Sequence, residues 1–332
     1  MPEITVLMTA YNSAIFIKQA IDSILKQTFK NFELLIINDG STDNTIDIIQ
    51  SYSDPRIRLI NNNSNKGLIY SRNIALTEAK GKYLAILDSD DIAIINRLQL
   101  QWETFEKRPS LALLGGQGIV IDKDGRKTGE ILIQKTGSDA VKLKLVFGNS
   151  FTHSTVMIRM EVFRKLGGYP NFQLAEDYAL FSRLSHDFES DNLPEVLVEY
   201  RIHGENISLR KQEEMSNLHV PIVKSRIKQF GIDAKSEQIE WLLHPNTVAD
   251  KDITSFKSFL KLLIHINRKN NFLEKTMFEK KILDIWYEAV LNTVRISSFY
   301  HVFTLPFPLF IRLSSKQVRR SLKNSLKGLF IK

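Results

Sequence analysis

Three carboxylates crowd into the four residues Asp88-Ser89-Asp90-Asp91, directly after the apolar run 83–87. Carboxylates this close repel one another and raise their own pKa values unless a cation lies between them. Magnesium and manganese take oxygen ligands, commonly one or two carboxylates together with the phosphates of a substrate. The cluster therefore indicates a metal–phosphate site. The alternative is a solvated turn, whose acids favour the start of a helix.

Two further charged residues in the first hundred positions are candidate site residues. Asp39 comes just after the apolar run 33–37, where a carboxylate can accept a hydrogen bond from the N–H of a nucleobase. Its alternative role is to form the turn before a glycine. Arg72 lies in a predicted helix and offers a cation for Asp88 or for a phosphate, or it forms a surface ion pair.

Two more candidates lie later in the chain. Glu176 and Asp177 form an acidic pair that opens a predicted helix after the breaker Gly-Gly-Tyr-Pro at 167–170. On local grounds these charges complement the partial positive charge of a helix N-terminus. His203 ends a predicted strand, and it is one of seven histidines. A single histidine carries little weight by itself.

The elements that must position these residues alternate between strand and helix periods over the first hundred residues. Short apolar runs that predict buried strands lie at 4–9, 33–37, 57–60 and 83–87, and helical patterns lie at 14–27, after 41–42 and at 68–79. Continuous apolar strands separated by helices predict a parallel sheet covered on both faces. Ligands of such sheets bind beyond the carboxyl ends of the strands. The polar residues expected at that edge are Tyr11, Asn12, Asp39, residues 61–65 and residues 88–91.

The pattern changes beyond residue 110. The sequence predicts a hairpin of 111–121 and 130–134, a helix at 138–147, a strand at 154–159, a helix at 175–184 and a strand at 195–201. From about 209 onward the pattern is mostly helical. We therefore predict a domain boundary near residue 210. A helical region would follow at 211–332.

The composition excludes several classes of protein. The 332 residues include 45 Lys and Arg, 37 Asp and Glu and no Cys, which gives a net charge of +8. Without cysteine there is no disulfide scaffold, zinc finger, iron–sulfur cluster or thiol nucleophile. The first residues carry no basic stretch, so no signal peptide is expected. No run of about 18 apolar residues occurs, so no transmembrane helix is expected.

The excess positive charge lies near the end of the chain. Eight basic and no acidic residues follow Glu288, so the first 288 residues balance at 37 of each sign. Within 305–332, apolar and basic side chains fall on opposite sides of a helix, as in amphipathic helices that bind anionic membranes. The alternative is a helix that packs its apolar side on the protein body. A nucleic-acid partner is not expected, because the basic segment has few interleaved aromatic residues.

Together the ordered pieces resemble the family 2 glycosyltransferases, whose fold is called GT-A. The resemblance covers roughly residues 3–210, and it rests on the order and spacing of six segments. They read VLMTAYN, LLIINDGSTDNT, NKGLIYSRN, YLAILDSDD, AEDYAL and YRIHGENIS. The resemblance implies an α/β fold with a Rossmann-like nucleotide-binding, mostly parallel sheet and a mostly helical C-terminal extension. It also implies a catalytic domain over 1–210, with a nucleotide-binding half at 1–100 and an acceptor half at 101–210.

The resemblance also implies roles for the donor side of the site. Thr9, Tyr11 and Asp39 resemble the residues that face the uracil of a UDP-sugar, with Asn12 beside them among the donor-binding residues. Arg72 resembles the arginine that braces the nucleotide and the acidic cluster.

The metal and the base follow from the same resemblance. Asp88 and Asp90 resemble the DxD pair, with Asp90 as the main contact of Mn²⁺ or Mg²⁺ and Asp88 facing ribose or metal. Asp91 extends that pair, which leaves open which carboxylate binds the metal. His203 resembles a late histidine near the metal or the diphosphate. Asp177 resembles the general base, and the neighbouring Glu176 and the donor's negative charge would raise its pKa toward working pH.

The expected function is an inverting, metal-dependent transfer of sugar from a UDP-sugar to a hydroxyl of a glycan or lipid-linked oligosaccharide, in the synthesis of a bacterial surface polysaccharide. The expected location is the cytoplasm, on the inner face of the membrane. One alternative is a sugar-phosphate nucleotidyltransferase. It is disfavoured because TAYNSA after the first strand is not a glycine-rich phosphate loop. The other alternative is a non-catalytic module that binds nucleotide-sugar or glycan. The donor sugar, the acceptor linkage and the oligomeric state are not specified by the sequence.

Overall fold

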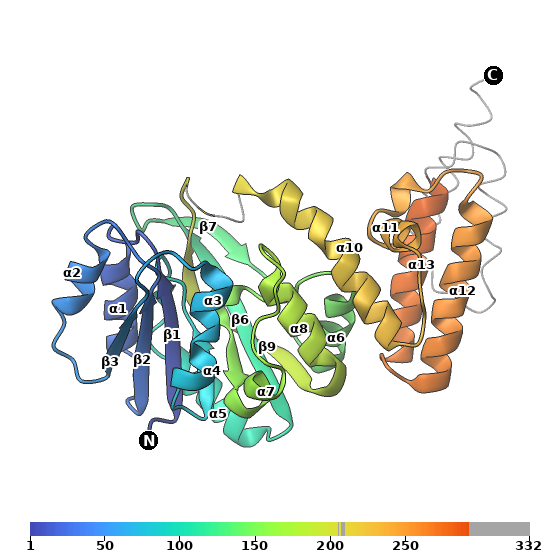
Figure 1. The fold of residues 1–332 in the computed structure, drawn as a ribbon. Helices are drawn as coiled ribbons and strands as arrows, with labels where there is room; N and C mark the ends of the chain where they lie inside the picture. Colours follow the sequence, from blue (N-terminus) through green and yellow to red (C-terminus); the bar gives the residue numbers. More distant parts are fainter. Residues whose placement is uncertain (205, 207–209, 292–332) are drawn as a thin grey trace. The chain divides into compact units, whose positions relative to one another are not determined.

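The computed structural model describes residues 1–204, 206 and 210–291 (Figure 1). The chain divides into two compact units, Met1–Leu218 and His219–Lys332, so the division falls within helix α10 (Gln212–Gln229). The predicted tail at 305–332 lies outside the described residues, and so does the sequence after Leu291 in general.

Nine strands form one sheet in the described part of the first unit, in the order β3-β2-β1-β4-β8-β6-β9-β5, with β7 paired to β6. The strands are β1 (Ile4–Ala10), β2 (Phe32–Asn38), β3 (Ile57–Asn61), β4 (Tyr83–Ile86), β5 (Ile92–Ala93), β6 (Leu111–Ile121), β7 (Lys127–Leu132), β8 (Met157–Arg159) and β9 (Glu189–Arg201). Strands β3, β2, β1 and β4 are mutually parallel, and β6 is parallel to β9. The prediction of a mostly parallel α/β sheet is confirmed.

The strands of the first half are connected by helices, as the alternating pattern predicted. These are α1 (Ile17–Leu25), α2 (Thr45–Gln50), α3 (Leu68–Asn73) and α4 (Ala75–Glu78). The single helix expected at 68–79 is divided at Ile74. The dihedral angles of Ile74 are still helical, φ −55° and ψ −30°, so the interruption is slight.

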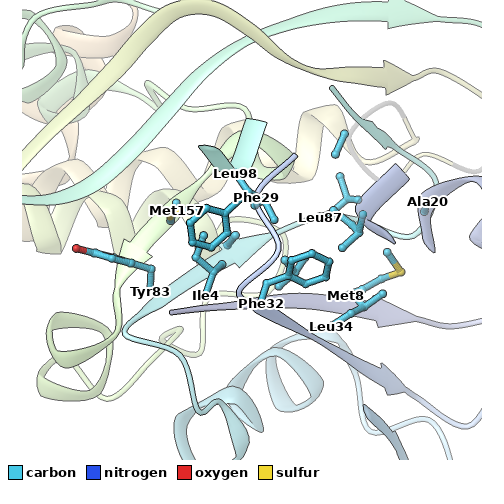
Figure 2. Close-up of a cluster of buried hydrophobic side chains, with 14 of the residues drawn as sticks. Ile4, Met8, Ala20, Phe29, Phe32, Leu34, Tyr83, Leu87, Leu98 and Met157 are labelled. Atoms are coloured by element: carbon cyan, nitrogen blue, oxygen red, sulfur yellow. The ribbon is translucent and has the colours of Figure 1, made fainter. Parts of the chain in front are cut away.

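The core of the first half explains why its strands read as unbroken apolar runs. Figure 2 shows Ile4 and Met8 of β1 and Leu34 of β2 in one cluster with Leu87, which follows β4. All four side chains are fully buried. Burying one such side chain contributes roughly 1.5–3 kcal/mol, so these strands are held firmly in the core. The polar residues after each strand are left at its carboxyl end.

The second half of the first unit brings distant segments to that edge. Its helices are α5 (Arg97–Lys107), α6 (Ser138–Phe147), the 3₁₀ turn η1 (His153–Thr155), α7 (Met160–Lys165) and α8 (Glu176–Asp187). Strand β8 lies antiparallel between β4 and β6, which places η1 beside the end of β4. The predicted hairpin of β6 and β7 is present, although β7 starts at Lys127 rather than at 130.

The described part of the second unit is helical, as expected. It contains the end of α10, then α11 (Ser236–Leu243), the 3₁₀ turn η2 (Pro245–Thr247), α12 (Ile253–Asn270) and α13 (Lys275–Leu291). Its core includes Phe256, Phe278 and Trp286, which are each at most 1% exposed. Within the described residues, every helix is too short or too polar to cross a membrane.

Candidate functional site

The loops after β1 and β2 are tied to each other by side-chain hydrogen bonds. The N–H of Thr42 donates to Oδ1 of Asn12 at 2.9 Å, and the N–H of Asn12 donates to Oγ of Ser41 at 3.0 Å. Asn12 has φ 50°, in the left-handed region that asparagine tolerates better than most residues. The structure therefore gives Asn12 a bracing role between the two loops. Tyr11 beside it is 48% exposed, and Thr9 is half-buried at the end of β1.

Asp39 is buried at the end of β2 and organises the loop that follows β3. Its Oδ1 accepts hydrogen bonds from Nδ2 of Asn62 at 2.7 Å and from the N–H of Lys66 at 2.9 Å. Its Oδ2 accepts one from the N–H of Gly67 at 2.9 Å. A carboxylate can accept about four hydrogen bonds, so one acceptor position is left on Oδ2. The predicted contact with a nucleobase N–H therefore stays open.

Arg72 joins the end of β4 to the start of α8. Its Nη2 donates to Oδ1 of Asp88 at 3.1 Å, and its Nη1 donates to Oε1 of Glu176 at 2.5 Å. The Arg72 side chain is 7% exposed, so the alternative of a surface ion pair is wrong. Burial alone would lower the pKa of Arg72, but the negative charges of Asp88 and Glu176 outweigh it and raise that pKa. The predicted acidic cluster and the predicted base-bearing pair thus share one cation.

Three residues that the sequence did not single out complete this arrangement. Nδ1 of His153 lies 3.3 Å from Oδ2 of Asp88 and 3.2 Å from Nη2 of Arg72, and its Nε2 lies 3.0 Å from the hydroxyl of Tyr169. The hydroxyl of Ser154 donates to Oδ2 of Asp88 at 3.0 Å. Burial alone would raise the pKa of Asp88, but His153 and Arg72 hold it well below its usual range. Asp88 is therefore a charged carboxylate with at least three partners.

Asp90 and His203 form a second pair next to Asp88. Nε2 of His203 lies 2.9 Å from Oδ2 of Asp90, and the two side chains are 15% and 27% exposed, respectively. The imidazole of His203 packs on Phe16, with ring centroids 4.9 Å apart. The predicted metal residues Asp90 and His203 are thus brought together, although they are more than a hundred residues apart in sequence.

This pair can be tested for its fit to a divalent cation. Two neighbouring ligands of an octahedral magnesium ion, each at about 2.1 Å, are about 3 Å apart. Nε2 of His203 and Oδ2 of Asp90 are 2.9 Å apart and form a hydrogen bond, so a cation that bound both atoms would replace this bond with little movement of either side chain. Among the described residues, no group of three or more His, Cys, Asp or Glu is arranged to hold a metal ion. A cation at this pair would therefore need phosphate oxygens and water to complete its shell.

Asp91 is buried beneath the cluster rather than facing it. Its side chain is 1% exposed, and its Oδ1 accepts the N–H of Arg201 at 2.8 Å. Burial raises the pKa of Asp91 well above its usual value, and the charges of Asp90 and Asp88 add to that effect. The alternative of a fully solvated turn is therefore wrong for Asp91.

Arg201 is a further residue that the sequence did not single out. The side chain is 1% exposed, and its Nε donates to the carbonyl oxygen of Asp90 at 2.8 Å. Its Nη2 donates to Oε1 of Gln19 at 2.6 Å, and its Nη1 reaches the carbonyl oxygens of Asp122 and Lys123. Arg201 therefore fixes the backbone of the acidic loop from the end of β9.

Glu176 and Asp177 occupy the first turn of α8, where acids complement the helix dipole. Glu176 is buried, and that burial raises its pKa, with Arg72 acting in the opposite direction. Asp177 is half-buried, and its Oδ2 accepts a hydrogen bond from Nδ2 of Asn149 at 2.9 Å. Of the two, Glu176 is engaged by an ion pair with Arg72, and Asp177 is held by a neutral amide.

Comparisons with known proteins identify the family of the chain. The family model described as Glycosyl transferase family 2 matches residues 5–167. An uncharacterized glycosyltransferase of Haemophilus influenzae is 31% identical over 289 residues, which cover 84% of this chain and 85% of that protein. The Escherichia coli protein named UDP-Glc:alpha-D-GlcNAc-diphosphoundecaprenol beta-1,3-glucosyltransferase WfaP is 33% identical over 213 residues, 64% of this chain and 82% of its own.

Solved structures share the fold. The crystal structure of S. aureus TarS 1-349 in complex with UDP-GlcNAc has a TM-score of 0.58 at 17% identity, covering 99% of this chain and 90% of that one. The mannosyltransferase PcManGT from Pyrobaculum calidifontis, in complex with GDP-Man and Mn²⁺, has a TM-score of 0.55 at 14% identity, covering 100% and 88%. The fold is therefore GT-A. The chain belongs to glycosyl transferase family 2, and it is a glycosyltransferase.

Proposed function

We propose that the chain transfers a sugar, with inversion, from a UDP-sugar to a hydroxyl of a lipid-linked glycan, and that it needs a divalent metal. One observation carries the proposal: Asp88, Arg72 and Glu176 connect the Asp90–His203 pair on one side to Asp177 on the other. A glycosyl transfer requires a place for a diphosphate and a base for the acceptor, and this connection holds the two in one site.

The donor would lie along the carboxyl edge of the parallel strands. The open acceptor position on Oδ2 of Asp39 suits the N–H of uracil. On the neighbouring strand β1, the half-buried Thr9 lies near the end and the exposed Tyr11 follows directly after it. WfaP is named as using UDP-Glc, and TarS was solved with UDP-GlcNAc, which supports a uridine donor.

Asp90 and His203 would hold Mn²⁺ or Mg²⁺, and Asp88 would face the ribose or the metal. A cation bound there would neutralise negative charge on the diphosphate as it leaves. Asp88 already receives hydrogen bonds from Arg72 and Ser154, so we assign the main metal contact to Asp90. PcManGT was solved with Mn²⁺, which supports a metal in this fold.

Asp177 would act as the general base. Its Oδ1 accepts the N–H of Tyr178 at 2.6 Å and its Oδ2 accepts Nδ2 of Asn149 at 2.9 Å. A carboxylate can accept about four hydrogen bonds, so each oxygen retains capacity to take the proton of an acceptor hydroxyl. The hydroxyl oxygen then forms its bond to the anomeric carbon as the bond from that carbon to the diphosphate breaks. A single displacement of this kind inverts the anomeric centre. Glu176 would keep α8 in place through Arg72.

The acceptor and the location are proposed from the relatives and the tail. WfaP is named for an acceptor on diphosphoundecaprenol, which is a lipid carrier. The basic amphipathic segment 305–332 would bind the enzyme to the inner face of the cytoplasmic membrane. We therefore propose a peripheral enzyme of bacterial polysaccharide synthesis.

The test is a panel of UDP-sugars, with UDP release and product mass measured in Mn²⁺ and in EDTA. The proposal expects turnover with at least one donor in Mn²⁺, loss of turnover in EDTA, and inversion of the anomeric centre by NMR. UDP binding with no turnover from any donor would favour a non-catalytic module. Formation of UDP-sugar from UTP and a sugar phosphate would favour a nucleotidyltransferase.

A further inference from the structure

His153 occupies a place in the site for which neither the sequence pattern nor the proposed mechanism gives a role. Its imidazole is 11% exposed and lies between groups of opposite charge, with Asp88 and Arg72 both within 3.3 Å of Nδ1. Its Nε2 contacts the buried hydroxyl of Tyr169 at 3.0 Å. The imidazole of His153 therefore contacts both members of the Asp88–Arg72 ion pair. Arg72 also binds Glu176, so His153 is linked through Arg72 to the start of α8.

The turn that carries His153 is fixed from below by α5. Nε2 of Gln101 donates to the carbonyl oxygen of Thr155 at 2.8 Å, and Nη2 of Arg97 donates to that of Val156 at 3.2 Å. The same Nη2 donates to the carbonyl oxygen of Ile86, the last residue of β4, at 2.8 Å. Both α5 side chains are fully buried. The imidazole therefore has a fixed position relative to the strand end that presents Asp88.

The hydrogen-bonding capacity of the groups limits what the ring can do. Nη2 of Arg72 only donates, so Nδ1 accepts from it when the ring proton is on Nε2, and Nε2 then donates to the oxygen of Tyr169. When the proton is on Nδ1, the ring donates to Asp88, and Tyr169 donates to Nε2. In both arrangements Nδ1 contacts the Asp88–Arg72 pair, and Tyr169 fixes the ring from the opposite side.

We infer that His153 is a positioning residue for the transfer reaction. Through its contacts with Arg72 and Asp88, it keeps the Asp88 carboxylate at a fixed position relative to α8, the helix that carries Asp177. This inference rests on the proposed function. Tyr169 extends the same support, because its backbone N–H donates to Oδ1 of Asn73 at 2.8 Å, next to Arg72, and its carbonyl oxygen accepts from Nδ2 of Asn73 at 2.9 Å.

The role of His153 predicts a specific pattern in steady-state kinetics. A shift of about 1 Å in reacting groups can lower a rate about 100-fold, so we expect His153→Gln to lower kcat by about 10- to 100-fold. The KM for the donor should change by less than about threefold, because the proposed donor contacts do not include His153. Asparagine can place a polar atom near the position of Nδ1, so His153→Asn should retain more activity than His153→Gln.

The decisive experiment is a double-mutant cycle in kcat between His153→Gln and Arg72→Lys. If His153 acts through Arg72, its replacement in the Arg72→Lys background should lower kcat by less than about twofold further. Circular dichroism and thermal melting identify any variant that does not fold. If His153→Gln does not fold, the same cycle is measured with His153→Asn in its place. His265→Asn, at an exposed position on α12, is the matched control and should keep the parental kcat.

Each outcome decides the inference. The inference is overturned if the wild-type enzyme is active and both His153 variants keep its kcat. It is also overturned if the kcat loss of the double variant equals the product of the losses of His153→Gln and Arg72→Lys. A wild-type enzyme that transfers from no donor overturns the proposed function, and the inference with it.

Discussion

Replacing Arg72 by methionine removes the cation shared by Asp88 and Glu176. The side chains of Arg72 and Glu176 are 7% and 8% exposed, so solvent does little to compensate for the loss. Breaking a buried ion pair by removing one partner typically costs about 3–5 kcal/mol. Asp88 keeps its contacts with His153 and Ser154, and Glu176 already has a raised pKa that favours proton uptake, so we expect the lower part of that range.

The expected loss can be measured by urea or thermal unfolding of the full chain. A loss of about 3 kcal/mol corresponds to a fall of roughly 6–12 °C in the melting temperature of a unit of this size. Glu176→Gln alone should cost about 1–2 kcal/mol, because Arg72 keeps Asp88. The double variant Arg72→Met/Glu176→Gln should be less destabilised than the sum by at least about 1 kcal/mol, since it leaves no unpaired buried charge at Glu176.

Two results would refute this reasoning. One is an unfolding free energy of Arg72→Met within about 0.5 kcal/mol of the parent, as for an ordinary surface substitution. The other is full additivity of the two single changes, which would show that Arg72 and Glu176 do not interact in the folded protein.

Three further predictions follow from the same structure. Burial alone would raise the pKa of Glu33, but hydrogen bonds from Thr5, Arg58 and the N–H of Lys80 outweigh it and lower that pKa. Glu33 therefore stabilises the fold above its unfolded pKa near 4.5, and this contribution is lost as the pH falls through the lower folded pKa. In urea unfolding, the stability of Glu33→Gln should depend less on pH than that of the parent between about pH 5 and 3. Asp90→Asn should weaken Mn²⁺-dependent UDP binding by at least about tenfold in calorimetry, because only two side chains would hold the metal. Removal of 305–332 should release the chain from anionic liposomes in a flotation assay, since each basic residue near the surface contributes about 1 kcal/mol.

Each of these has a clear contrary result. Equal slopes for Glu33→Gln and the parent below pH 5 would show that this carboxyl is not linked to acid stability. UDP binding by Asp90→Asn that responds to Mn²⁺ as the parent does would remove Asp90 from the metal site. Equal flotation with and without 305–332 would favour packing of that segment on the protein body.

The strand and helix pattern of the first hundred residues was predictable because β1, β2 and β4 are buried on both faces and each helix on one, whereas the edge strand β3 is only half-buried. That placement also made Asp39 and Asp88 predictable as edge residues, since they follow such strands directly. The ion pairs were harder to predict from the sequence. Arg72 finds Glu176 across 104 positions of sequence, and only the antiparallel insertion of β8 and the position of α8 bring them together.

His153 and Arg201 escaped prediction for a related reason. His153 is an isolated histidine in a short 3₁₀ turn, and its position depends on the buried side chains of α5 rather than on its neighbours in sequence. Arg201 binds backbone carbonyls of two loops, and such contacts leave no pattern of residue types. A fully buried arginine near an acidic loop becomes informative only when its burial is known.

The central claim is that Asp177 removes the proton of the acceptor hydroxyl in a metal-dependent transfer. The most direct measurement is the transfer rate of Asp177→Asn in Mn²⁺ with an active UDP-sugar, beside Asp187→Asn at the other end of α8, whose side chain is 68% exposed. General-base catalysis contributes typically 10²–10⁴-fold, so we predict a loss of at least about 100-fold for Asp177→Asn and nearly none for Asp187→Asn. A rate for Asp177→Asn close to that of Asp187→Asn would contradict the account.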